Sequence, residues 1–442
     1  MKNNQPFTMK RTSLAAAVAL CTLLGSTSSQ ALDFNGYFRS GIFTSTDGSQ
    51  TSWVDHKLGR FGNETDGWYD LMLGQTIYQN DEGQSFSVHT TLDGNIDQGK
   101  SWNPVDSSGP NSMQFLDMYA DAKGFIAAAP EATLWAGRRS YDKREIQMLD
   151  FKPVAIAGTG VGLQGIDAGP GKLSLAWMRE DAGATTRDVT GTSDAGDFNG
   201  NYIDVRYAKL PVFGDATLEV IADYLFVNKT DAQDDSASTG EIYNAKNAFQ
   251  PTLILTKPLD NGFNETTLQY ADHVFANDMT KLGYNEPSFD ASHDYSDAKA
   301  YRVINTGEAY LTDNIVMAHT LMYVHGSDTY SDVSSSAQKW DKVDSYTALI
   351  RPAYIWNKNN KTAVELGWFR QKATVNGNDL VESGKKITLA HVLTMGPSLL
   401  SARPDFRFYT TYIKADNNEL DNVTFDGKDH QLSFGVQAEV WW

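Results

Sequence analysis

Cysteine is almost absent from this sequence. The single residue of this type, Cys21, lies close to the N-terminus. One cysteine forms no disulfide within the chain and no thiolate metal cluster. Leu20 stands directly before Cys21, where a lipoprotein would carry a small residue, so lipid attachment at Cys21 is also excluded. Functions that depend on cysteine chemistry can therefore be set aside.

Long apolar runs are also lacking. The first apolar run, residues 14–24, is shorter than the ~20 residues that a membrane-spanning helix needs. Basic residues precede it, and Ser29-Gln30-Ala31 fits a small-x-small cleavage site. We therefore expect residues 1–31 to be a secretory signal peptide and residues 32–442 to be the mature domain.

Basic charge is scarce relative to acidic charge. The chain has 37 Lys and Arg against 55 Asp and Glu, a net charge of −18. Nucleic-acid-binding proteins present basic surfaces, so a nucleic acid partner is not expected. The acidic excess fits solvated loops or a surface that faces a cation-rich layer of lipopolysaccharide, and composition leaves both open.

Beyond residue 31, no apolar stretch reaches 18 residues, so an exported membrane protein of this composition would not be helical. The other structure that can span a bilayer is a closed β-barrel, in which every backbone polar group is paired between strands. Such strands need only one apolar face, and aromatic residues, 12% of the chain, enrich the two membrane interfaces.

The C-terminal segment alternates clearly. One parity is apolar: Leu432, Phe434, Val436, Ala438, Val440 and Trp442. The other is Ser433, Gly435, Gln437, Glu439 and Trp441. Successive side chains of a strand point to opposite faces, so we expect the first set to face lipid and the second to face the lumen. A soluble sheet would show the same period, but the terminal aromatic residues and the signal peptide favour a membrane barrel.

The same alternation recurs near residues 33–42, 68–77, 173–177, 202–207, 217–226 and 363–368. Between the strands, residues 230–240 and 276–300 are polar and are expected to be extracellular loops. At ~10 residues per strand, the mature length allows roughly 16 to 18 strands. The prediction is an all-β protein, one transmembrane antiparallel barrel that encloses an aqueous channel.

Several motifs occur in order along the mature chain: Leu32–Gly41, Arg60–Glu64, Trp135–Arg139, Met148–Phe151, Gly169–Leu175, Ile350–Trp356, Arg403-Pro404 and the final Trp441-Trp442. Together they resemble the maltoporin family of carbohydrate porins, and Arg60–Glu64 resembles the family's second-strand motif. The resemblance implies a homotrimeric barrel of 18 strands in the outer membrane of a Gram-negative bacterium, with its third loop folded into the pore.

A sugar presents apolar ring faces and a rim of hydroxyl groups, so a path for sugars needs aromatic planes and charged hydrogen-bond partners. The lumen-facing parities carry both kinds of side chain. The resemblance assigns Tyr37, Trp68 and Trp441 to a row of stacking rings, called the aromatic slide. It assigns Arg39, Arg60 and Asp70 to the flanking polar track. The alternative is a place in the interfacial aromatic belt, which is the preferred interpretation for Tyr69, Trp177, Trp368 and Trp442.

Trp102 occupies the loop from which the family supplies a further slide residue to the neighbouring subunit. About six extra residues separate Trp102 from the aligned Phe115. A loop tryptophan at the trimer interface is therefore an equal alternative for Trp102.

A dense charge cluster follows Trp135: Arg138, Arg139, Lys143, Arg144, Glu145, Asp150 and Lys152. In a barrel aligned with the family, this segment is the pore constriction. We expect Arg139, Lys143, Glu145, Asp150 and Lys152 to line it. Lys152 stands where the family has a tyrosine, and we expect this cation to favour neutral or anionic sugars over cations.

Other departures concern the substrate. Gln147 replaces a histidine of the family and Leu116 replaces an arginine of the track. Two exit-side slide aromatics align with Thr266 and Ser401, so the slide is expected to be short at the exit. A long maltodextrin is disfavoured as the substrate, and a different sugar, or several, is favoured.

Enzymes also occur in outer-membrane barrels. The sequence has no HExxH, GxSxG or GxxxxGK motif, so we expect no enzymatic activity, no metal and no cofactor. The leading hypothesis is passive, facilitated diffusion of carbohydrates, with outer-membrane lipid and lipopolysaccharide around the barrel and the assembly machinery recognising the C-terminal strand. The runner-up is a general diffusion porin without a tight saccharide site.

Overall fold

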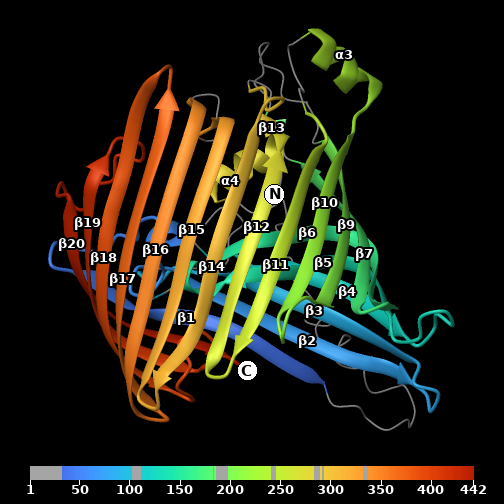
Figure 1. Ribbon diagram of the computed structural model, residues 1–442, viewed down its shortest axis with the longest axis horizontal. Helices are drawn as coiled ribbons and strands as arrows, with labels where there is room; N and C mark the ends of the chain where they lie inside the picture. The colour runs from blue at the N-terminus through green and yellow to red at the C-terminus, as the bar shows by residue number, and fades with distance from the viewer. Residues whose placement is uncertain are drawn as a thin grey trace, which may run out of the picture.

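The computed structural model describes residues 32–101, 111–182, 184–185, 198–239, 245–282, 289–290, 293–331 and 337–442. The expected signal peptide, residues 1–31, lies outside them. Eighteen strands of the described chain form one antiparallel sheet, which closes because β1 pairs with both β2 and β20. Figure 1 shows the resulting barrel, with the first and last strands side by side. The predicted fold, including the strand number implied by the resemblance, is confirmed.

The barrel strands follow the chain around the wall. They are β1 Asp33–Ser45, β2 Gly67–Gln79, β3 Ser85–Ile96, β4 Gln114–Lys123, β5 Thr133–Ile146, β6 Phe151–Ala168, β7 Gly171–Ala182, β9 Phe198–Pro211, β10 Thr217–Asn228, β11 Ala248–Leu259, β12 Gly262–Asp272, β14 Lys299–Thr312, β15 Ile315–Tyr330, β16 Lys339–Asn357, β17 Asn360–Val375, β18 Asn378–Thr394, β19 Asp405–Asn418 and β20 His430–Trp441. The short strands β8 (Ala184–Thr185) and β13 (Phe289–Asp290) pair with each other outside this sheet.

The two faces of the wall follow the predicted parity. On β20 the ring of Phe434 is 44% exposed, whereas the neighbouring inward carboxylate of Glu439 is 0% exposed. The strands β7, β9 and β17 behave in the same way: Trp177, Ile203 and Trp368 are exposed on the outer face. The tryptophans assigned to the belt, Trp177, Trp368 and Trp442, thus lie on the outward parity.

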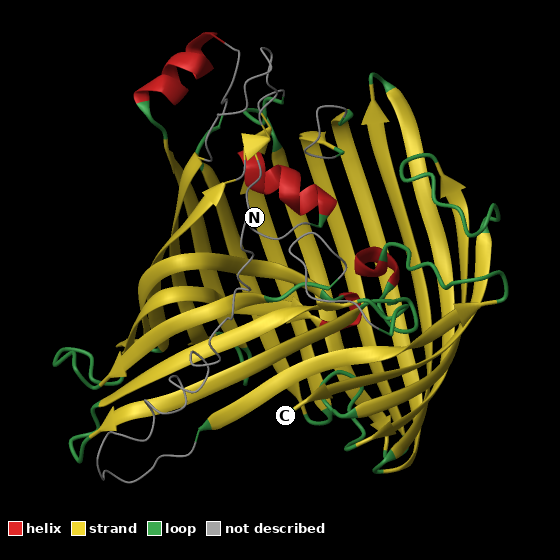
Figure 2. Cartoon of the chain, turned by 180° about the vertical axis from the view of Figure 1, so that it is seen from behind, coloured by secondary structure: helices red, strands yellow, loops and turns green. Residues whose placement is uncertain are grey.

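Helices lie only in the connections. They are α2 Asp55–Leu58, η1 Gln147–Leu149, α3 Asp231–Thr239 and α4 His273–Lys281, and no described helix could span a bilayer. Figure 2 shows α3 beyond the ends of the strands and the others within the outline of the wall. The expected loop 276–300 therefore begins as a buried helix, because Val274, Phe275 and Met279 of α4 pack against the inner wall.

The β5–β6 hairpin leaves the wall halfway up. β4 pairs with β5 only as far as Arg138, and β7 pairs with β6 only from Thr159 onward. The rest of the hairpin pairs with itself and reaches strands on another side of the barrel. Gln269 of β12 donates a hydrogen bond to the Pro153 carbonyl (2.9 Å), and the Arg302 guanidinium of β14 lies 4.6 Å from the centre of the Phe151 ring. A hairpin that lies inside a barrel makes such contacts.

The β1–β2 connection also packs inside the barrel. Arg60–Glu64 belongs to this connection, because β2 begins only at Gly67, so its assignment to the second strand was wrong. Lys386 of β18 donates to the Gly59 carbonyl (2.5 Å) and the Phe61 carbonyl (2.9 Å). A Cβ on Gly62 would lie 2.2 Å from the Thr411 hydroxyl, so only glycine allows this close approach. Backbone polar groups of the connection are satisfied by the wall.

Candidate functional site

Three neighbouring strands, β20, β1 and β2, place the predicted slide and track residues side by side. In one cross-strand row Trp441 lies opposite Tyr37, and Tyr37 lies opposite Asp70. In the next inward row Glu439 lies opposite Arg39, and Arg39 lies opposite Trp68. Residues opposite each other on neighbouring strands have Cβ atoms ~5 Å apart. The two rows therefore form one continuous lumen face that alternates aromatic rings and charges.

Tyr37 is held at the centre of this face. Its hydroxyl donates to Glu439 Oε1 (3.0 Å) and accepts from Arg60 Nη2 (3.2 Å). Arg60 also forms ion pairs with Glu64 (2.7 Å) and Glu439 (2.9 Å) and is almost fully buried. Burial disfavours the charge of Arg60, but the nearby carboxylates of Glu64 and Asp150 outweigh it and raise the pKa of Arg60. The ring of Tyr37 is thus fixed by charged partners.

Arg39 joins three separate segments of the chain. Its guanidinium forms ion pairs with Glu64 (3.1 Å), with Asp66 (2.5 Å) and with Asp150 at the hairpin tip (2.6 Å). The carboxylate of Asp66 is partly open to solvent, whereas that of Glu64 is buried. Arg39 therefore anchors the hairpin tip to the wall and leaves Asp66 at the edge of the pore.

The two tryptophans of this face are also oriented by charged groups. The Trp68 indole N–H donates to Asp70 Oδ1 (2.8 Å). The Arg403 guanidinium lies 4.5 Å from the centre of the Trp441 ring, and Arg403 is held by Glu439 (2.6 Å). A cation against a ring face stabilises that ring electrostatically. Arg403 covers one face of Trp441, so only the opposite face is left for a ligand.

The hairpin supplies the charges that oppose this wall. Lys152 Nζ lies 3.0 Å from Asp150 Oδ1, and Lys143 and Glu145 are exposed. The positive charges of Lys143 and Lys152 both attract the carboxylate of Asp70. Burial disfavours the charge of Asp150, but Arg60, Lys152 and Arg39 outweigh it and hold the pKa of Asp150 well below its usual range. The hairpin thus presents fixed charges of both signs.

The two arginines that follow Gly137 point to opposite faces of the barrel wall. Arg139 points inward, where its guanidinium lies 4.7 Å from the ring of Tyr119 and 5.1 Å from that of Trp135 and donates to Gln164 (2.6 Å). Arg138 is exposed and shares its parity with the outward Leu134. The interpretation of Arg138 as part of the constriction was wrong, because β5 is still a wall strand at this position.

The two expected slide positions at the exit, Thr266 and Ser401, differ in the structure. Thr266 has the parity of the outward Leu268 and accepts a hydrogen bond from Asn305 (2.9 Å). It faces out of the barrel, so the interpretation of Thr266 as a lost slide position was wrong. Ser401 is exposed in the turn between β18 and β19.

Trp102, the further slide residue expected on a loop, lies outside the described residues.

Sequence reasoning missed the residues that hold the site together. Glu439 receives Arg60, Arg403 and Arg407. Its inward parity was visible, but a partner set drawn from the β1–β2 connection and from residues 403–407 was not. Asp93 of β3 lies directly opposite Asp70, and its position in an alternating strand could have revealed this second acidic group.

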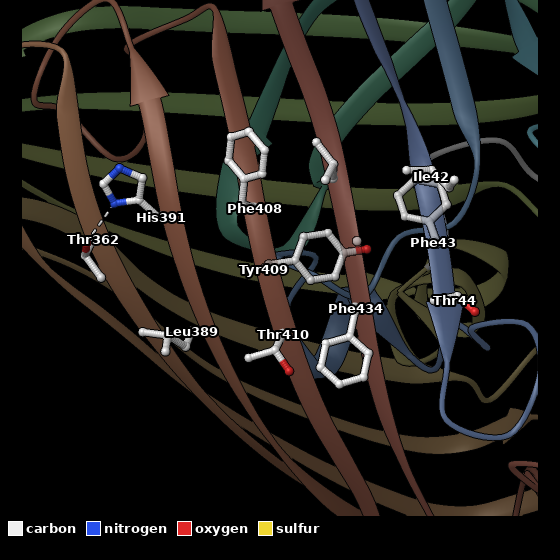
Figure 3. Close-up of a pocket in the computed structure, with 12 residues that line it drawn as sticks. Ile42, Phe43, Thr44, Thr362, Leu389, His391, Phe408, Tyr409, Thr410 and Phe434 are labelled. Carbon is white, nitrogen blue, oxygen red and sulfur yellow. Dashed lines mark hydrogen bonds between the residues drawn. The ribbon is translucent and has the colours of Figure 1, made fainter.

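One depression among the described residues lies outside the lumen. Figure 3 shows it on the outer face of β1 and β17–β20, lined by Ile42, Phe408 and Phe434, with a hydrogen bond between Thr362 and His391 (3.1 Å) at one end. These apolar side chains have the outward parity, so the depression faces the membrane. In the described part of the chain, no group of three or more His, Cys, Asp or Glu could hold a metal ion.

Comparison with known proteins agrees with this architecture. The family model of the LamB porins matches residues 32–442. The chain belongs to the LamB porin family. As a large β-barrel of this family, it is a porin of the Gram-negative outer membrane, which confirms the predicted location and the family resemblance.

Solved structures similar to this chain include two that are described as outer-membrane proteins, DcaP and OmpT. OccD3 (OpdP) of Pseudomonas aeruginosa has 12% identity over 93% of this chain and 92% of that chain, with a TM-score of 0.48. The channel DcaP of Acinetobacter baumannii has 11% identity over 94% and 100%, with a TM-score of 0.46. OmpT of Vibrio cholerae, in its trimer form, has 15% identity over 93% and 99%, with a TM-score of 0.41.

Proposed function

We propose that this porin mediates the passive, facilitated diffusion of carbohydrates into the periplasm. The observation that carries the proposal is the lumen face of β20, β1 and β2, where Trp441, Tyr37 and Trp68 alternate with charged side chains. Sugar rings would stack on the aromatic planes while their hydroxyl groups exchange hydrogen bonds with the charges.

The hairpin completes the polar part of the path. Asp70 on the wall is opposed by the exposed Lys143, and Glu145 and Asp66 are also open to solvent. Lys143 can donate hydrogen bonds and the carboxylates can accept them, and a sugar hydroxyl group uses both kinds of partner. Weak and repeated sites of this kind suit transport, because a ligand must leave as readily as it enters.

The substrate class follows from how the rings are held. Arg403 covers one face of Trp441, and Ser401 carries no ring at the exit. The stacking surface is therefore concentrated on the three neighbouring strands, which suits a short saccharide better than a long helical chain. Lys152 beside Asp150 favours neutral or anionic sugars over cations.

The assembly we propose is a homotrimer in which Trp102 takes part at the subunit interface or in the slide. The C-terminal strand, ending in the outward Trp442, would be the part recognised by the barrel-assembly machinery. Lipid and lipopolysaccharide would surround the outer face. The protein would act as a channel without enzymatic activity.

A general diffusion porin is the second candidate, and one observation favours it. Arg39 already binds three carboxylates and Arg60 binds two. Donors that are satisfied within the protein contribute less to sugar binding, because a hydroxyl group must compete with a carboxylate for them.

Titration of sugars against ion current through single porins in planar bilayers separates the two candidates. A saturable block by one or more saccharides of a broad panel is expected for the sugar porin. If none of the panel blocks the current at any concentration, the proposal of a saccharide site is wrong and the general porin remains. Trp68→Ala removes a ring of the lumen face and should weaken the block. Trp368→Ala removes a ring of the outer face and is the matched control.

A further inference from the structure

The outward Arg138 belongs to a row of side chains on the outer wall that the channel function does not use. In register, Met118 of β4 lies opposite Arg138 of β5, Arg138 opposite Thr159 of β6, and Thr159 opposite Arg179 of β7. All four are exposed. Two arginines thus face the membrane side of the barrel, separated by one strand that carries a small side chain.

The spacing of the two arginines suits a single anionic group. Their strands are two strand spacings apart, about 10 Å between backbones, and both side chains are long enough to converge above Thr159. Arg138 uses only its Nε, which donates to the Phe115 carbonyl (3.1 Å). Arg179 uses Nε and Nη2, which bind Asp181 (2.8 and 2.7 Å). In the described residues, both Nη atoms of Arg138 and the Nη1 of Arg179 have no acceptor.

The row has a net positive charge despite Asp181. On the outer edge of β16–β19 the outward lysines are instead neutralised one by one, although Arg370 of β17 has no ion pair among the described residues. Lys342 pairs with Asp344 (3.1 Å), Lys372 with Asp379 (2.6 Å) and Lys385 with Asp416 (3.2 Å). Arg138 has no carboxylate partner among the described ion pairs, although more than half of the charged residues of this chain are acidic.

The surface beside the arginines is apolar. The next outward row of the same strands is Ala136, Val161, Trp177 and Ile203, and the last three are exposed. The arginines lie on the extracellular side of this row, because β6 and β7 are joined by the two-residue turn Gly169-Pro170, whereas the opposite end of β7 leads into a long loop. Short turns are periplasmic and long loops are extracellular in such barrels.

We propose that Arg138, Thr159 and Arg179 bind a phosphate group of lipid A, the phosphorylated glycolipid anchor of lipopolysaccharide, with its acyl chains on the apolar row of Val161, Trp177 and Ile203. Arginine guanidinium groups match phosphate with two parallel hydrogen bonds. A phosphate at the outer-leaflet boundary above exposed apolar side chains is the arrangement that only a lipid of that leaflet supplies. Figure 1 shows β5, β6 and β7 as neighbours on one side of the barrel.

The test compares lipid A carrying both of its phosphates with dephosphorylated lipid A, added to the delipidated full-length porin in detergent and counted by native mass spectrometry. Wild-type protein is expected to bind the phosphorylated form about tenfold more tightly than the dephosphorylated form, as two charged contacts allow. The double variant Arg138→Gln/Arg179→Gln is expected to lose this preference. The control Lys385→Gln, whose lysine is paired with Asp416, is expected to keep it.

Folding is checked independently by the single-channel conductance of each variant. Substitutions on the outer face should leave this conductance unchanged. Two results overturn the proposal. One is an undiminished preference for phosphorylated lipid A in the double variant. The other is unchanged lipid binding together with loss of the oligomer, which would assign the two arginines to a contact with a second copy of the chain.

Discussion

The two faces of the closing strands carry the same kinds of ring in opposite surroundings. On the inner face Trp441 lies against Arg403 and Tyr37 is hydrogen-bonded to Glu439. On the outer face Trp442 packs edge-on against Phe34, with ring centres 5.4 Å apart, and also against Phe38. Trp441 and Trp442 are adjacent and chemically identical. The difference teaches that strand parity, and not residue type, decides whether an aromatic ring can meet a solute or a lipid.

The largest effect is expected from breaking the charge cluster behind the inner face. Glu439→Ala leaves Arg60, Arg403 and Arg407 buried without their shared carboxylate. Removing one partner of a buried ion pair costs about 3–5 kcal/mol. The free energy of unfolding, measured by denaturant titration of the porin in lipid vesicles, should fall by that amount. Glu145→Ala, at an exposed position of the hairpin, is the control, and an equal loss there would contradict the explanation.

The next effect sharpens the comparison of the two faces directly. Trp68→Ala and Tyr37→Ala should each weaken sugar block by ~1–3 kcal/mol if stacking on these rings resembles other ring-on-aromatic contacts. Trp442→Ala and Trp368→Ala remove outward rings and should leave the block unchanged. The apparent affinity of the blocking sugar in planar bilayers measures all four. Equal effects on both faces would remove the slide from the sugar path.

A smaller effect is expected at the hairpin. Lys152→Tyr removes the cation that lies 3.0 Å from Asp150 and should raise the preference for cations over anions severalfold, because the negative charges of Asp150 and Asp70 are then less compensated. Reversal potentials in a salt gradient measure this preference. Strong cation selectivity in the wild type that does not change in the variant would contradict the role of Lys152.

The smallest effect is expected from acid. The pKa of Asp150 is held well below its usual range by Arg60, Lys152 and Arg39, against the effect of burial. A carboxylate of lowered pKa adds stability above its ordinary pKa of about 4, and the stability is lost only as pH falls toward the lowered value. Conductance and sugar block should therefore be constant from pH 7.5 to about pH 5. A step in that window that disappears in Asp150→Asn would contradict this ionisation state.

Local patterns were sufficient for much of the wall. Alternation placed Glu439 and Trp441 inward and Phe434 and Trp442 outward, because the period of a strand depends only on its own backbone. It also put Tyr37, Arg39, Trp68 and Asp70 on inward parities before any pairing was known. What alternation could not give was the register that sets Tyr37 between Trp441 and Asp70.

Connections between strands were harder to predict. Arg60–Glu64 matched a motif that the resemblance assigned to a strand, yet the residues lie in a connection that packs against β18. Helix α4 begins at His273 and extends into the stretch 276–300, whose composition resembled a surface loop. The composition of a segment reflects its average preference for solvent. These two segments, however, each bury one face against barrel strands that lie far away in the sequence.

The sequence by itself therefore determined that this chain forms a barrel, which side chains point inward on strands with a clear alternation such as β1 and β20, and which family it resembles, because these depend on local period and on motifs read in order. Only the tertiary structure decided that Arg138 faces the membrane while Arg139 faces the lumen environment, that Thr266 lies outside, and that Glu439 collects three arginines. Those outcomes depend on where each strand leaves the wall and on which distant segments meet, and the free energy that fixes them comes from contacts between residues far apart in the chain.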